Sequence, residues 1–181
     1  ILMVCYQESG QTAEALKVAE ALATKSPNDK RAQMNLATIY LNSEQEAKAA
    51  AVLEKMRSSG LLTEERDYKQ LFITYANMDG KEKEVISVVN EGLQKGVLKG
   101  DFQTYLALAQ SYYFTDQPTQ AIDAYRKAAP LAPNGEAYLN LARLLWQEDR
   151  IPEAKEAARQ AQAKGVKNAA DVKKILALPS K

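Results

Sequence analysis

Two pairs of neighbouring carboxylates are the residues in this sequence that could do acid–base chemistry. Glu64 adjoins Glu65, and Glu82 lies two residues before Glu84. Paired carboxylates in an enclosed site can act as a general acid and a general base. Both pairs stand among other charged residues near predicted helix starts, where the helix dipole stabilises a carboxylate. We therefore interpret them as solvated first helical turns and not as a catalytic pair.

Other chemistry is excluded by the residue types that are missing. The sequence contains no histidine, which excludes serine–histidine and cysteine–histidine nucleophiles and histidine metal sites. The single cysteine, Cys5, is interpreted as a packing residue of a helix and leaves the redox compartment open. The eight glycines form neither a phosphate-binding loop nor a dinucleotide-binding fingerprint. We predict that the protein is not an enzyme and binds no metal and no cofactor.

The composition is that of a soluble globular chain. Of 181 residues, 46% are hydrophobic and 26% are charged, which argues against disorder. Lysine and arginine number 24 against 23 acidic residues, so no strong field favours nucleic acid. No apolar run approaches the length of about 18 residues that a spanning helix needs. We expect neither nucleic-acid binding nor direct membrane insertion in this chain.

The elements that must position any functional side chain are predicted from an internal repeat. Small residues recur at Ala15, Ala49, Val85, Ala121 and Ala154, with spacings of 34, 36, 36 and 33 residues. Such a period indicates repeated pairs of antiparallel helices, in which small residues let the two helix axes approach closely. The most complete copy contains Tyr105, Leu108, Ala109, Tyr112, Ala121, Tyr125, Ala128 and Pro133.

That copy resembles the tetratricopeptide repeat at each of its eight signature positions. The resemblance implies an all-α fold, an α-solenoid of antiparallel helical hairpins with a short C-terminal capping helix. It implies one solenoid over 1–181. Its approximate repeats are 1–27, which lacks its beginning, then 28–62, 63–98, 101–133 and 134–166, and the capping helix spans 168–178.

Turn residues agree with this division into helices. Gly80 falls between two paired helices, where a residue with positive φ can end the first of them. Pro118 and Pro152 fall near the starts of second helices, where proline loses no helical hydrogen bond.

The resemblance also implies where a protein or peptide partner binds. In this family the first helix of each hairpin lines a concave groove. Carried over by register, the groove residues are Asn35, Thr38, Lys69, Gln70, Gln110, Tyr113, Phe114, Asn140, Arg143 and Trp146.

Two features of this set suggest binding, and each has an alternative. Asn35 and Asn140 share one groove position, where an amide can donate to and accept from a peptide backbone; asparagine also simply tolerates a wet helix face. Tyr113, Phe114 and Arg143 are residue types that dominate interface hot spots. Trp146 belongs with them if it faces the groove, but it could instead lie under the terminal helix.

A narrower resemblance is carried by residues 62–71, residues 107–113 and the tail 173–179. These segments resemble the tetratricopeptide proteins encoded beside TonB, ExbB and ExbD in bacteria. The resemblance implies a periplasmic accessory of TonB-dependent transport, whose targeting segment would lie before Ile1. The alternatives are a scaffold for an unrelated envelope or cytoplasmic assembly and, in third place, an enzyme.

Overall fold

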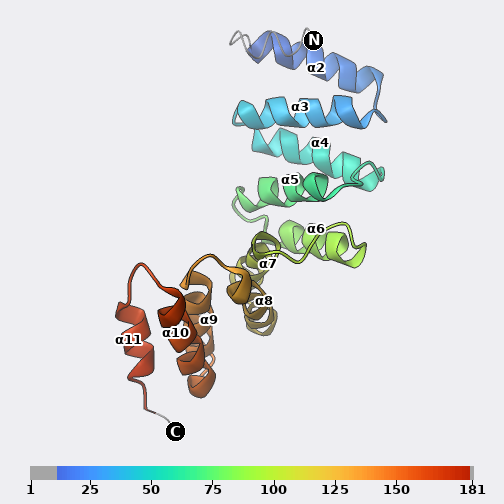
Figure 1. Cartoon of the computed structure of the whole chain (residues 1–181). Coiled ribbons are helices and arrows are strands. Elements are labelled where there is room, and N and C mark those ends of the chain that lie inside the picture. Colours follow the sequence, from blue (N-terminus) through green and yellow to red (C-terminus); the bar gives the residue numbers. More distant parts are fainter. Residues whose placement is uncertain (1–11, 180–181) are drawn as a thin grey trace. The chain divides into compact units, whose positions relative to one another are not determined.

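The protein is helical throughout the part that the structure describes. A computed structural model describes residues 12–179, which contain ten α-helices and no strand (Figure 1). The prediction of an all-α fold is confirmed. The chain divides into two compact units, Ile1–Lys81 and Glu82–Lys181. Cys5 and the beginning of the first expected repeat lie outside the described residues. The single solenoid and its repeat boundaries stay a prediction.

The first unit contains four described helices that follow one another as neighbours (Figure 1). They are α2 (Thr12–Lys25), α3 (Lys30–Asn42), α4 (Glu46–Ser58) and α5 (Glu65–Ala76). The helices α2, α3 and α4 each contact the helix that follows, and the buried apolar residues of the unit include Ala19, Leu36, Leu53 and Leu71.

The second unit contains six helices, of which the last is a short cap. They are α6 (Glu82–Gln94), α7 (Phe102–Phe114), α8 (Pro118–Leu131), α9 (Glu136–Gln147), α10 (Ile151–Lys164) and α11 (Ala170–Leu176). Successive helices contact one another, and α11 packs on both α9 and α10. Val172 and Ile175 of α11 are fully buried, so this helix covers apolar surface that the last hairpin would otherwise expose.

The small residues of the repeat are all buried. Ala15, Ala49, Ala121 and Ala154 are 0% exposed, and Val85 at the equivalent position is 1% exposed. Because these side chains are short, the neighbouring helix can approach until backbones nearly touch. Larger buried residues such as Leu53 and Tyr68 fill the remaining space.

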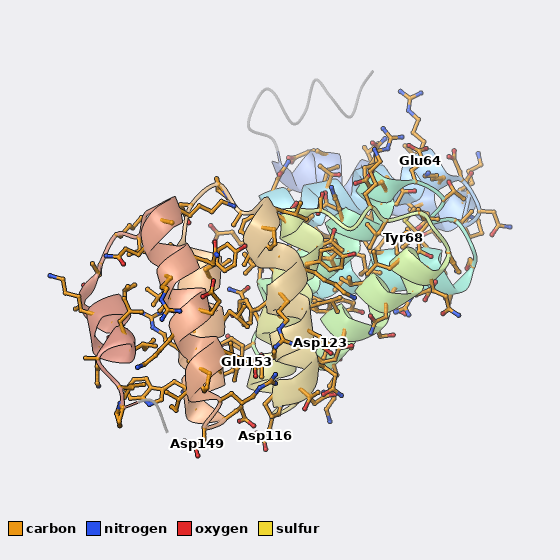
Figure 2. All side chains as sticks on the ribbon, turned by 60° about the horizontal axis from the view of Figure 1, so that its bottom comes forward. Glu64, Tyr68, Asp116, Asp123, Asp149 and Glu153 are labelled. Carbon is orange, nitrogen blue, oxygen red and sulfur yellow. The ribbon has the colours of Figure 1, made fainter. Side chains whose placement is uncertain are left out.

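Within residues 12–179, a residue with positive φ stands at the same distance before the small repeat residue in the links α3–α4, α5–α6, α7–α8 and α9–α10. These residues are Glu44 (φ 56°), Gly80 (φ 72°), Asp116 (φ 56°) and Asp149 (φ 54°). Asp116 and Asp149 lie at the same end of the helices of the second unit (Figure 2). Gly80 has the predicted positive φ, but α5 already ends at Ala76. The three acidic residues were not predicted from the sequence, because acidic residues adopt this conformation less readily than glycine.

The hydrogen bonds around these turns explain why the conformation is kept. The amide of Asp116 donates to the carbonyl of Tyr113, and the amide of Gln117 donates to the carbonyl of Tyr112. This is the pattern of a Schellman motif, which satisfies the last carbonyls of the first helix. Pro118 and Ile151 then begin α8 and α10, with Pro152 in second place, so the expectation for both prolines is confirmed.

In the first unit a buried carboxylate joins the starts of α3 and α5. The Asp67 side chain is fully buried, and its Oδ2 lies 2.6 Å from the Lys30 ammonium. The same oxygen accepts hydrogen bonds from the backbone amides of Thr63 and Glu64, each at 2.9 Å. Asp67 therefore caps α5 and links it to α3 with one oxygen atom.

These contacts set the protonation of the pair. Burial by itself would raise the pKa of the Asp67 carboxyl, but the hydrogen bonds from Lys30, Glu64 and Thr63 outweigh it and the pKa lies below its usual value. Burial would lower the pKa of Lys30, but Asp67 and Glu64 raise it above its usual value. Both groups are therefore charged at neutral pH.

We expect Ala121→Leu to lower the free energy of unfolding by about 1–3 kcal/mol, because the added atoms have no space at this fully buried position. Denaturant unfolding followed by the fluorescence of Trp146, the only tryptophan, measures this in the second unit. Ala163→Leu on the exposed side of α10 is the matched control and should change stability by less than about 0.5 kcal/mol. Equal effects of the two substitutions would contradict the packing argument.

We expect Asp67→Asn to lower the free energy of unfolding at pH 7 by about 2 kcal/mol, through loss of charged hydrogen bonds. The pKa of Asp67 is lower in the folded state, so its stabilising contribution is complete above the unfolded pKa of about 4 and is lost as pH falls through the folded pKa. Circular dichroism during denaturation at pH 7 and at pH 2–4 measures both effects. Asp79→Asn, at an exposed position, is the control and should unfold like wild type at both pH values. The account would be refuted if the stability of Asp67→Asn fell with pH as steeply as that of wild type.

Candidate partner-binding cleft

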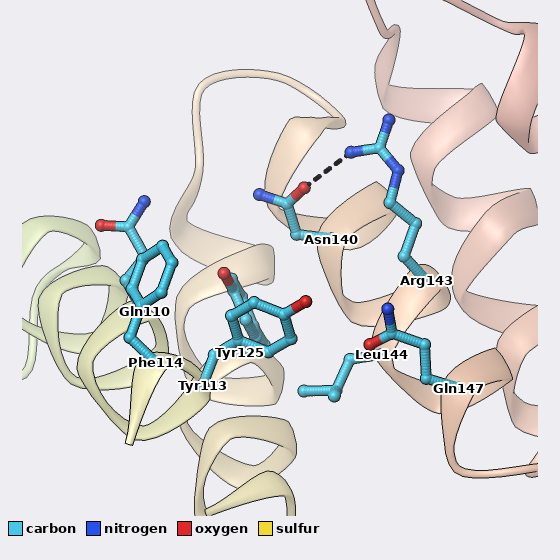
Figure 3. Close-up of a pocket in the computed structure, with 8 residues that line it drawn as sticks. All are labelled: Gln110, Tyr113, Phe114, Tyr125, Asn140, Arg143, Leu144 and Gln147. Atoms are coloured by element: carbon cyan, nitrogen blue, oxygen red, sulfur yellow. Dashed lines mark hydrogen bonds between the residues drawn. The ribbon is translucent and has the colours of Figure 1, made fainter. Parts of the chain in front are cut away.

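A cleft of about 300 Å3 opens between α7 and α9 in the second unit, with α8 beneath it (Figure 3). Residues from three helices line it: Gln110, Tyr113, Phe114, Tyr125, Asn140, Arg143, Leu144 and Gln147. Five of the residues predicted from the repeat register therefore share one cleft, namely Gln110, Tyr113, Phe114, Asn140 and Arg143.

One side of the cleft is aromatic. Phe114 is 70% exposed and Tyr113 is 43% exposed. Their ring centres are 5.5 Å apart with an angle of 71° between the planes, an edge-to-face contact. Both residues stand in the last turn of α7, directly before the tight turn at Asp116. The Schellman turn therefore fixes the backbone that carries this pair.

The floor of the cleft is formed by two buried residues. Tyr125 of α8 and Leu144 of α9 expose only 5% and 3% of their surface, yet both reach the cleft. Burial raises the pKa of the Tyr125 hydroxyl, the nearby Tyr113 adds to this, and Arg143 opposes it. Tyr125 is therefore a neutral phenol at physiological pH, able to donate or to accept a hydrogen bond.

The opposite side of the cleft is polar, and its amide is held in one orientation. The Nη1 of Arg143 donates to the Oδ1 of Asn140 at 3.0 Å. The amide nitrogen of Asn140 consequently lies on the side away from Arg143 and above the two tyrosine rings (Figure 3). Asn140 thus presents mainly a donor to the cleft, where the sequence predicted a group that both donates and accepts.

Arg143 itself is bound by the capping helix. Its Nε and Nη2 lie 2.9 Å and 2.8 Å from the Oδ2 of Asp171, which belongs to α11. Together with the bond to Asn140, these contacts engage all three guanidinium nitrogens. The sequence predicted that Arg143 lines the groove, but it gave no sign that a residue of the cap holds it.

Trp146 also lies against the capping helix. It is half-buried and does not belong to the residues that line this cleft. The Lys174 ammonium of α11 stands 4.9 Å from the centre of its ring, a cation–π contact. The sequence left open whether Trp146 faces the groove or lies under the terminal helix. In the structure it lies beside the terminal helix.

The four predicted groove residues of the first unit lie on α3 and α5. Asn35 is half-buried and Thr38 is exposed, with its hydroxyl donating to the carbonyl of Met34 at 2.9 Å. Lys69 pairs with Glu65 at 2.8 Å, and Gln70 is half-buried. None of the four belongs to the cleft between α7 and α9.

Tyr125 and Leu144 also line the cleft and were not predicted to do so from the sequence. Tyr125 is a signature residue of the repeat and was assigned to packing alone. Leu144 follows Asn140 by one helical turn, so the helical period is the signal that could have placed it beside the cleft.

The carboxylate pairs lie at helix starts, as interpreted from the sequence. Glu64 precedes α5 and is paired with Lys30 and Arg66, Glu65 belongs to the first turn of α5, and Glu82 and Glu84 belong to the first turn of α6. Within residues 12–179 no cluster of three or more acidic, cysteine or histidine side chains is placed to hold a metal ion. In that same part of the chain no helix is long and apolar enough to cross a membrane.

Comparison with known proteins places these features in a family. Two family profiles described as "Tetratricopeptide repeat" match the chain, one over residues 6–69 and the other over residues 106–170. No curated protein matches the chain.

Solved structures with the same fold include a MamA protein, which has a TM-score of 0.71 and 17% identity over 91% of this chain and 94% of that chain. The MamA fragment "41-end" from Desulfovibrio magneticus RS-1 has a TM-score of 0.68 and 17% identity, over 97% and 91% of the two chains. YrrB, described as "a TPR protein with an unusual peptide-binding site", has a TM-score of 0.74 and 11% identity, over 95% and 87%. These likenesses confirm the predicted α-solenoid fold.

Proposed function

Because the chain belongs to the tetratricopeptide repeat family, whose members generally act as protein–protein interaction scaffolds, we propose that it holds an extended segment of a partner protein in the cleft between α7 and α9. The observation that carries this proposal is the exposure of Tyr113 and Phe114 beside a row of side-chain amides. Aromatic residues at a concave surface are the usual anchors of protein interfaces.

The chemistry of the cleft suits a peptide. An apolar side chain of the partner would lie against the rings of Tyr113 and Phe114, and its removal from water would supply most of the affinity. The free amide hydrogens of Asn140 would donate to a backbone carbonyl of the partner. Gln110 and Gln147, whose side chains can both donate and accept, flank this position along the cleft.

A structural neighbour supports the same function. YrrB, which shares the fold, is described as having a peptide-binding site. A tetratricopeptide fold is typically a non-enzymatic scaffold, and we propose the same for this chain.

We further propose that the partner is a component of the TonB, ExbB and ExbD system and that the protein works in the periplasm. What supports this is the sequence resemblance of residues 62–71, 107–113 and 173–179 to tetratricopeptide proteins encoded beside that system. The competing proposal is a scaffold for an unrelated envelope or cytoplasmic assembly.

We expect heptapeptides selected from a random display library by the full chain to bind Phe114→Ala about tenfold more weakly than wild type, through loss of an aromatic anchor. Fluorescence anisotropy with the labelled peptides measures this. Because Phe114 is 70% exposed, the substitution should leave stability almost unchanged.

Leu131→Ala is the matched control, since Leu131 is 51% exposed, ends α8 and does not line the cleft. Its affinity for the same peptides should equal that of wild type. If no peptide is selected, or if both substitutions weaken binding equally, the cleft is not the binding site.

For the partner, we expect crosslinking in the native cell envelope to capture TonB, ExbB or ExbD with the wild-type chain and to lose them with the folded double variant Phe114→Ala, Asn140→Ala. Mass spectrometry of the crosslinked products, with Leu131→Ala in parallel, provides the measurement. Reproducible capture of other proteins in their place would favour the competing scaffold, and equal capture by all variants would remove the cleft from the interaction.

A further inference from the structure

The electrostatic state of the cleft is decided by one pair of residues. Among the eight described residues that line it, Arg143 alone carries a charge. A free guanidinium at that position would attract acidic side chains and chain-terminal carboxylates, which it can bind through two parallel hydrogen bonds. The preference of the cleft for charged or uncharged partners therefore depends on whether this guanidinium is available.

Each of the three guanidinium nitrogens already makes one contact within the chain, and two of these contacts are with a carboxylate. Nε and Nη2 contact the Asp171 carboxylate at 2.9 Å and 2.8 Å, and Nη1 donates to Asn140 at 3.0 Å. The charge of Asp171 cancels that of Arg143 at close range. The remaining groups of the cleft are three amides, two phenols and apolar surface, none of which carries a charge.

Asp171 is kept in place by the packing of its helix and not only by the ion pair. Its neighbour Val172 and Ile175, one turn further on, are both fully buried, and α11 contacts α9 and α10. A partner carboxylate would have to compete for the charge of Arg143 with a carboxylate of the same chain, which is present at an effective concentration on the order of millimolar or more. The exposed pair by itself is weak, but its attachment to a packed helix favours the intramolecular contact.

We infer that the cleft accepts an uncharged stretch of a partner chain, and that Asp171 is the residue that sets this specificity by neutralising Arg143 and, through it, orienting the amide of Asn140. This inference rests on the proposed peptide-binding function. It assigns to the capping helix a role in recognition in addition to its cover of the last hairpin.

Parallel selections of the random heptapeptide library test the inference. The full chain is used as wild type, as Asp171→Asn and as the double variant Asp171→Asn, Arg143→Gln. We expect wild type to select peptides with aromatic or aliphatic residues and few acidic ones, Asp171→Asn to select peptides rich in aspartate and glutamate, and the double variant to lose that enrichment.

Affinities of one acidic heptapeptide from the Asp171→Asn selection then give the size of the effect. We expect it to bind Asp171→Asn about fivefold more tightly than wild type at low salt, with most of the difference lost at about 0.5 M salt. Asp123→Asn is the matched control, because Asp123 is an exposed acidic residue of α8 outside the cleft lining, and it should select peptides like those of wild type.

The outcomes separate the inference from the function on which it rests. If no protein selects peptides, the proposed function fails. If peptides sensitive to Phe114→Ala are selected but wild type and Asp171→Asn select the same charge composition, the function stands and the role of Asp171 is overturned. Acidic enrichment that persists in the double variant would overturn the role of the Arg143 charge.

Discussion

The close approach of paired helices is the constraint on which the rest of this structure depends. Alanine at 15, 49, 121 and 154 is completely buried, and valine at 85 nearly so. These short side chains set the distance between helix axes, and that distance fixes which larger residues meet between one helix and the next. Since the same spacing recurs along the chain, the outward faces of the first helices also recur, and the aromatic and amide residues of α7 and α9 come to face one cleft.

The turns contribute to function because they end the first helices at defined residues. A left-handed residue at Asp116 follows the last residue of α7, Phe114, and its C-cap, Thr115. The equivalent Asp149 follows the last residue of α9, Gln147, and its C-cap, Glu148. The left-handed conformation is strained for acidic residues, and the hydrogen bonds of the Schellman motif offset this strain. The backbone from which the exposed aromatic side chains of α7 project is thereby held at a defined place.

Carboxylate–cation pairs do two different kinds of work in the two units. Asp67 is fully buried, and one of its oxygens binds Lys30 and accepts hydrogen bonds from two backbone amides. It therefore stabilises the start of α5 and its link to α3. Asp171 and Arg143 are each nearly half exposed, and such a pair adds little to stability. Its effect is on the charge and the hydrogen-bond geometry of the cleft. The Asp67–Lys30 pair is therefore structural, whereas the Asp171–Arg143 pair is proposed to govern specificity.

The sequence by itself determined the helices and the pairing of α3 with α4, α7 with α8 and α9 with α10, because the alanine spacing and the prolines at Pro118 and Pro152 act through local geometry that repeats along the chain. It also selected Gln110, Tyr113, Phe114, Asn140 and Arg143, since residues on one face of a helix follow from its period. Only the tertiary structure decided that Tyr125 and Leu144 reach the floor of the cleft, that Lys174 of α11 stands over Trp146, and that Asp171 holds Arg143 across 28 positions of sequence. These contacts depend on how the capping helix packs and on side-chain rotamers, and the helical period carries no information about either.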